Sequence, residues 1–263
     1  MFAAHDASAA YYYSTLANGG VACAPGTLGV AGSIIGSEVC GHPADKLGYA
    51  AGAGLRINLP NTSGSYFQIQ YNYTQGAAKY ADNTQTAFFG YIKGGTAGFG
   101  FIDDGIVNNA TGTVAVTKVQ GLNAAFDYHN MLGGKLWGSL YGHWLSVSYD
   151  GLANASICAP AALFNNTNPA FPAPGGSLFN NTNCANTFSL WGIGSRWQYN
   201  FTPAFYVGFD VLYQKLMSAD NGGIVTFTPV GSATQPAVPA TIYQVTNQDQ
   251  WQFRLRLHRD ILP

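Results

Sequence analysis

The segment Gln248–His258 limits most strongly what this chain can fold into, because polar and apolar residues alternate along it from Gln250 to His258. Its even positions hold glutamines, arginines and a histidine, whereas its odd positions hold Trp251, Phe253, Leu255 and Leu257. Successive side chains of a β-strand point to opposite sides, so a strand here has one apolar face and one basic, polar face. In water the apolar face needs a packed core. In a bilayer it can face lipid while the polar face lines a wet interior.

The same alternation recurs along the chain and predicts an all-β, antiparallel fold of about ten strands of roughly the length that a tilted membrane strand needs. The expected strands are residues 3–13, 45–59, 67–74, 87–93, 97–101, 112–129, 135–149, 189–199, 205–214 and 248–258. Most of these strands carry apolar residues at odd positions.

The connections between these strands are sorted by length. Long connections follow Tyr13, Tyr73, Ile102, Tyr149 and Met217, and they alternate with short ones near Pro60, Gly94, Asn130 and Asn200. Outer-membrane barrels alternate short periplasmic turns with long external loops in this way. A β-sandwich would also alternate in polarity, but it has no reason to sort its connections. We therefore expect residues 1–263 to form one domain, a transmembrane β-barrel.

One strand has aromatic residues on both faces, so alternation alone does not orient it. In the segment 135–149 the even set contains Leu136, Leu140 and Trp144. We predict that the odd set faces outward, unless a bulge switches the faces midway. This set is Trp137, Tyr141, Leu145, Val147 and Tyr149.

Composition excludes several classes of function. Charged residues make up only 9% of the chain and the formal net charge is −1, which argues against a nucleic-acid partner. No run approaches the roughly 18 apolar residues of a membrane helix. The first residues lack the basic and apolar regions of an export signal. For an exported protein, this implies a mature form or a fragment.

The four cysteines form two local pairs, Cys23 with Cys40 and Cys158 with Cys184. Each pair encloses a segment rich in Gly, Ala, Pro or Asn, which favours one disulfide per loop in an oxidising compartment. Zinc binding that uses Cys40 and a nearby histidine is the alternative, but no ligand spacing supports it.

Charged and amide side chains on the polar parity are the candidate functional residues. They would line a water-filled lumen, where arginines facing aspartates set up a transverse field that tunes ion selectivity. The alternative, compatible with the first, is that these arginines pair with carboxylates and fix the strand register. The predicted pore-lining residues are Arg56, Gln68, Gln70, Asp127, Arg196, Gln198, Asp210, Gln214, Arg254 and Arg256.

The sequence offers no catalytic constellation, cofactor motif or metal site. His143, Ser139 and Asp127 could be imagined as a hydrolase triad, but their order and spacing fit no known motif. We therefore expect a protein that is not an enzyme.

Three runs give a more specific resemblance. They are His42–Pro60, the segments Tyr66–Gln68 and Asn72–Ala77 after it, and Phe253–Asp260. These runs resemble the porins of alphaproteobacteria, especially the rhizobial group. The resemblance implies a trimeric, sixteen-stranded porin of the bacterial outer membrane, in contact with lipid, that admits small hydrophilic solutes and ions by passive diffusion.

The chain departs from that family pattern in length. Family members are longer and carry their early strands and an inward-folded constriction loop before the region matched here, so we expect an N-terminally truncated porin that resembles the last ten strands. Many such proteins also end in phenylalanine, whereas this one ends in Pro263. The alternative function is a non-conducting barrel that displays disulfide-closed surface loops for binding.

Overall fold

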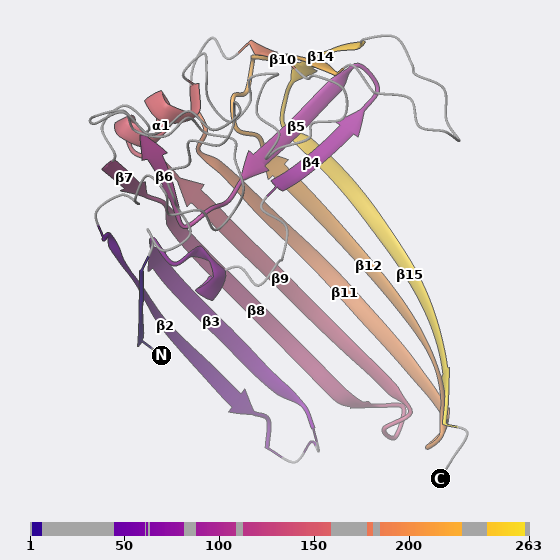
Figure 1. The fold of residues 1–263 in the computed structure, drawn as a ribbon. Coiled ribbons are helices and arrows are strands. Elements are labelled where there is room, and N and C mark those ends of the chain that lie inside the picture. The colour runs from indigo at the N-terminus through magenta and orange to yellow at the C-terminus, as the bar shows by residue number, and fades with distance from the viewer. Residues whose placement is uncertain are drawn as a thin grey trace.

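A computed structural model describes residues 2–6, 45–60, 62, 64–81, 88–108, 113–158, 178–180, 185–227 and 241–260. Eight antiparallel strands form one curved sheet, called the main sheet here (Figure 1). In spatial order they are β1 (Phe2–Asp6), β2 (Leu47–Asn58), β3 (Tyr66–Gln75), β8 (Lys118–Met131), β9 (Leu136–Ser148), β11 (Phe188–Thr202), β12 (Phe205–Met217) and β15 (Gln248–Arg259). The predicted all-β, antiparallel class is confirmed. Among the described residues, the edge strands β1 and β15 do not pair with each other.

Strand length and connection length follow the predicted pattern in the main sheet. From β2 onward its strands have 10 to 15 residues, enough to cross a bilayer when tilted. Three hairpins turn through the short segments 59–65, 132–135 and 203–204, which lie together at the lower end of Figure 1. The long connections leave from the opposite end. These ends are called the turn end and the loop end. None of the described helices is long and apolar enough to span a membrane.

The hairpin predicted around Gly94 is not part of the main sheet, so the expected ten wall strands become eight. It forms β4 (Phe88–Lys93) and β5 (Thr96–Phe101), each of six residues. A tilted strand needs about 9–11 residues to cross the hydrocarbon core, so these two are too short. They belong to a second sheet at the loop end, the cap sheet, with β10 (Leu178–Asn180), β13 (Ile224–Phe227) and β14 (Thr241–Val245).

Other elements appear inside segments that the sequence presented as loops. The predicted strand 112–129 breaks at Thr117, whose amide donates to Asp104 O, so that β7 (Thr113–Val116) pairs with β6 (Gly105–Asn108) before β8 begins. A short 3-10 helix, η2 (Ala78–Tyr80), follows β3. The helix α1 (Gly151–Cys158) follows β9 and is capped by the Asp150 carboxylate, which accepts from the amide of Ala153 at 2.8 Å.

These loop-end elements fold onto the concave side of the main sheet and share one hydrophobic core with it, the cap core. Phe99, Phe101 and Ile157 come from the cap. The main sheet contributes Val119, Leu145, Val147, Phe188, Leu190 and Leu216. Close packing is possible because β5 carries glycine at Gly100, where a Cβ atom would lie 2.3 Å from the Phe188 ring. The resemblance placed the inward-folded constriction loop before the region that this chain matches. In the structure the described parts of the connection from β3 to β8 fold inward.

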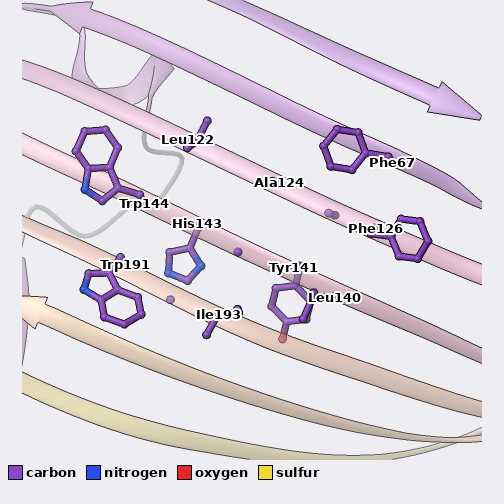
Figure 2. Close-up of a pocket in the computed structure, with 13 residues that line it drawn as sticks. Phe67, Leu122, Ala124, Phe126, Leu140, Tyr141, His143, Trp144, Trp191 and Ile193 are labelled. Atoms are coloured by element: carbon purple, nitrogen blue, oxygen red, sulfur yellow. The ribbon is translucent and has the colours of Figure 1, made fainter.

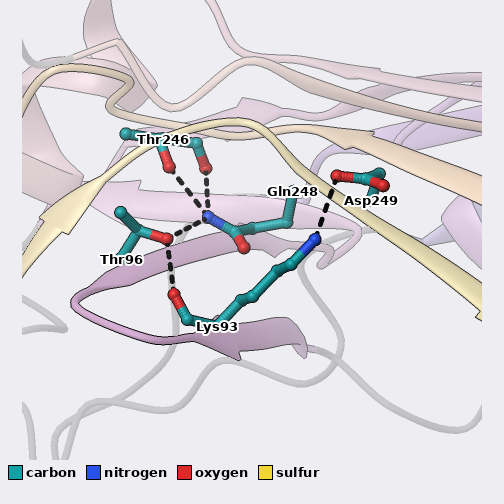
Figure 3. Close-up of polar contacts among 5 residues, drawn as sticks. All are labelled: Lys93, Thr96, Thr246, Gln248 and Asp249. Atoms are coloured by element: carbon teal, nitrogen blue, oxygen red, sulfur yellow. Dashed lines mark hydrogen bonds and ion pairs between the residues drawn. The ribbon is translucent and has the colours of Figure 1, made fainter.

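Polar contacts hold the cap sheet to the edge strand β15 (Figure 3). The Gln248 side-chain amide donates to Thr96 Oγ1 at 3.1 Å and to Thr246 Oγ1 at 2.8 Å, and Gln248 is itself buried. Lys93 Nζ lies 3.7 Å from Asp249 Oδ1, but both side chains are well exposed, so this ion pair contributes little. The buried glutamine is therefore the stronger anchor of the cap.

Candidate functional site

The register of the main sheet brings all ten predicted pore-lining residues to one face, called the polar face. In an antiparallel pair, directly opposed residues project to the same side of the sheet. Arg56 opposes Gln68, and Tyr66 opposes Asp127. Asp127 then leads across the sheet through Ser139, Arg196 and Asp210 to Arg254. Gln70 and Gln214 belong to a second such row, which passes through Asn123, His143 and Gly192. Gln198 opposes Gly208, which opposes Arg256.

The predicted facing of the segment 135–149 is wrong. Trp137 opposes Gln198, and Tyr141 opposes Ala125 and Gly194, so the odd residues of β9 project from the polar face. Leu136, Leu140 and Trp144 project from the other. The described register of β9 with β11 is unbroken, and the irregularity in its pairing with β8 is confined to Tyr128–Met131 near the turn, so β9 does not switch faces midway. The polar face accepts aromatic and apolar residues here because the cap core covers Leu145, Val147 and Tyr149.

Tyr141 fits on the polar face because its neighbour is a glycine. A Cβ atom at Gly194 would lie 2.4 Å from the Tyr141 ring, so a larger residue would collide with it. The Tyr141 hydroxyl donates to Asp210 Oδ1 at 2.5 Å. Arg196 approaches the other oxygen, Oδ2, through Nε and Nη2, both at 3.4 Å. Asp210 is thus bound from the β9 and β11 side.

Next to this charged row lies a neutral row of amides. Gln214 Nε2 is 3.2 Å from His143 Nε2, and Gln214 Oε1 accepts from Gln250 at 2.8 Å and from Gln252 at 3.2 Å. Gln250 also donates to the hydroxyl of Tyr91 in the cap sheet at 3.3 Å. The amide row therefore joins the wall to the cap.

On the β2 and β3 side, aromatic and charged groups combine. The Arg56 guanidinium lies over the Tyr66 ring, with 3.8 Å from Cζ to the ring centroid, and its Nε donates to Asn58. This stacking is a cation–π contact and holds the guanidinium near the wall. Tyr66, an inward bulky residue that sequence reasoning did not place among the pore-lining set, therefore orients Arg56.

The imagined hydrolase triad is not assembled. Ser139 and His143 are four residues apart on β9, about 13 Å along a strand, and His143 contacts Gln214 instead. Among the described residues, no group of three or more His, Cys, Asp or Glu side chains could hold a metal ion. Cys23, Cys40 and Cys184 lie outside the described residues, as does the side chain of Cys158, so the predicted disulfides are not described.

The opposite face of the main sheet is apolar and exposed. On β15 the exposed fractions are 60% for Trp251, 68% for Phe253 and 67% for both Leu255 and Leu257. A soluble protein rarely leaves so continuous an apolar surface in water, so this face requires lipid or another apolar partner.

The apolar face also contains a shallow hollow of about 460 Å³ (Figure 2). Trp144 and Trp191 stand at one end, and Phe67, Phe126 and Leu140 stand at the other. Its lining is almost entirely apolar, and most of its side chains project from the apolar face. It is therefore separate from the polar face and offers no path for a hydrophilic solute.

Comparison with protein families gives a match over most of the chain. The family model described as the porin subfamily matches residues 9–253. Searches of the curated proteins and of the solved structures find no match.

Proposed function

Because the chain belongs to the porin subfamily, we propose that it forms a water-filled channel through which small hydrophilic solutes and ions diffuse passively. We assign this channel to the outer membrane of a bacterium, as the finer resemblance to alphaproteobacterial porins suggests. The polar face of the main sheet would line the lumen, and the apolar face would contact lipid.

The observation that supports this proposal is the separation of the two faces. Ten charged or amide residues share one face, whereas Trp251, Phe253, Leu255 and Leu257 occupy the other and are well exposed. A strand with this arrangement is stable where lipid lies on one side and water on the other. Neither a soluble sheet nor a helix bundle would need it.

The polar face offers a passing solute both charge and neutral hydrogen bonding. Arg196 and Asp210 form an ion pair with side chains 50% and 14% exposed, and the amides of Gln214, Gln250 and Gln252 follow in the next rows. A hydrated solute can exchange water for these groups without losing its hydrogen bonds. Such groups act weakly enough for the solute to leave again.

The direct test is single-channel conductance of the refolded chain in a planar bilayer, after heat-modifiable gel mobility has verified folding. Discrete ohmic current steps are expected. A folded protein that gives no steps would contradict the proposal and favour the non-conducting display barrel instead.

We further propose that the channel assembles as a homotrimer and that disulfides join Cys23 to Cys40 and Cys158 to Cys184 in the loops. Cross-linking in lipid should give a ladder that ends at three copies. Alkylation of the unfolded protein should label these cysteines only after reduction. A ladder that ends at two copies, or labelling without reduction, would contradict the respective proposal.

A further inference from the structure

Positive charge exceeds negative charge on the polar face. Along the eight described strands of the main sheet, this face carries Arg56, Arg196, Arg254 and Arg256 against Asp127 and Asp210. Asp210 is already bound by Arg196 and by the Tyr141 hydroxyl. The excess positive charge therefore lies away from the Arg196–Asp210 ion pair, and it is greatest on β15.

Arg254 and Arg256 form an adjacent pair on β15. They stand two positions apart on one strand and project from the same face, so their backbone attachment points are about 7 Å apart. Both are exposed, and neither makes a hydrogen bond or an ion pair among the described residues. Arg254 directly opposes Asp210, but that carboxylate is held toward β9 and β11.

The surroundings of Arg256 leave room beside it. Its directly opposed residue is Gly208, which has no side chain, and the next residue across the sheet is Gln198. Beside Arg256 the wall therefore holds an amide and no directly opposed acidic side chain, and the carboxylate that opposes Arg254, Asp210, is already bound by Arg196 and Tyr141. The long, flexible side chains can turn toward each other and reach a single ligand from two sides.

We propose that Arg254 and Arg256 form a recognition site for small oxyanions, with carboxylate or phosphate groups, and that the channel prefers anions to cations. This inference rests on the proposed channel function. The planar guanidinium fork matches a carboxylate or phosphate and donates two parallel hydrogen bonds to it. Because both arginines are exposed to water, they bind weakly, which suits a site that must release its solute.

The first test is the reversal potential of the wild-type channel in a KCl gradient. We expect a reversal potential whose sign shows that chloride permeates better than potassium. The double variant R254Q/R256Q removes two of the four arginines and should bring the channel close to non-selective. For two unit charges about 8 Å from a passing ion, chloride loses attraction and potassium loses repulsion, so the expected drop in the chloride-to-potassium permeability ratio is about fivefold at 0.1 M salt and up to about thirtyfold at low salt.

Arg259→Gln is the matched control, because Arg259 lies on the same strand but has the parity of the apolar face. It should leave the reversal potential unchanged. The double variant R254K/R256K separates charge from geometry: it should keep the chloride preference but weaken the current block by added inorganic phosphate or succinate. Comparison of the two blockers shows which oxyanion the site prefers.

A conducting wild-type channel that prefers potassium would overturn the inference, and so would an R254Q/R256Q channel with an unchanged reversal potential. Equal block of the wild type and R254K/R256K would overturn the recognition site but not the charge preference. Absence of any current from folded wild-type protein would instead contradict the proposed function. The reversal potential of the wild type tests the predicted preference for anions even where a variant does not fold.

Discussion

Replacing Asp220 with Asn is expected to stabilise the cap at neutral pH and to remove its dependence on pH. Asp220 follows β12 at the loop end and is only 1% exposed. Its neighbour Ala219 donates its amide to Phe99 O in the cap sheet, and the Asp220 amide donates to Ala185 O. Neither of its carboxylate oxygens has a hydrogen-bond partner in the described part of the chain. A charge here is therefore buried without compensation.

Burial raises the pKa of Asp220 from 3.8 to about 6. A raised carboxyl pKa means that the folded cap favours the protonated form, so the stabilisation is fully present below about pH 3.8 and is lost as the pH rises through 6. At about 1.4 kcal/mol for each pH unit between the two values, the ionised form costs the cap at most about 3 kcal/mol. Asn matches Asp in size and tolerates the positive φ of 50° at this position.

The assay is amide hydrogen exchange in lipid at about pH 4.5 and pH 8, corrected for the intrinsic effect of pH on exchange. The informative peptides cover β5 and the segment 218–223. In the wild type these peptides should exchange at least tenfold faster at pH 8, whereas in D220N the two corrected rates should agree. Asp45→Asn, which changes an exposed carboxylate before β2, is the control. Equal pH dependence in the wild type and D220N would refute the reasoning.

Two further pairs of substitutions test the packing of the cap and the assignment of the faces. Gly100→Ala should destabilise the cap by about 1–3 kcal/mol, because the added Cβ would overlap the Phe188 ring. Gly95→Ala, the control, has open space around it and should leave the stability of the cap unchanged. Hydrogen exchange of the cap distinguishes the two variants. Leu255→Arg, on the apolar face, should reduce the stability of the lipid-embedded protein by about 2–4 kcal/mol, whereas Gln252→Arg on the polar face should be tolerated. Urea titration of folding into vesicles measures the stability of both variants. Equal losses of stability would contradict the assignment of the faces.

The sequence was sufficient to predict the strands of the main sheet and their two faces where each strand has lipid on one side and water on the other. In β15 every second residue from Trp251 to Leu257 is apolar, so one segment already gave the faces of Arg254 and Arg256 correctly. The hairpin turns near Pro60, Asn130 and Asn200 followed from composition. All ten predicted pore-lining residues share one face for the same reason, because the side-chain period of a strand leaves no other choice once one face is fixed.

The sequence was not sufficient to predict the location of a strand that is buried on both faces. β5 alternates glycine with Phe99 and Phe101 and therefore resembles a membrane strand, although its six residues are too few to cross. Its true environment comes from Phe188 and Ser218, which are distant in sequence and which no local pattern identifies. Helix α1 was missed for another reason, since Asp150 gives a recognisable N-cap but only two turns follow.

Departures from alternation mark where the cap begins. On β9, β11 and β12 the polar face carries Leu145, Leu190 and Leu216 at the loop end, then His143 and Gln214, and then Arg196 and Asp210 toward the turn end. An apolar residue on the polar parity has no reason to face water, so several of them at one level of neighbouring strands require a cover. The facing error in β9 had this origin, because Leu145 and Val147 were assigned to lipid when they pack under the cap. Apolar residues on the wrong parity, aligned across strands, therefore predict an inward-folded loop even before its own sequence is considered.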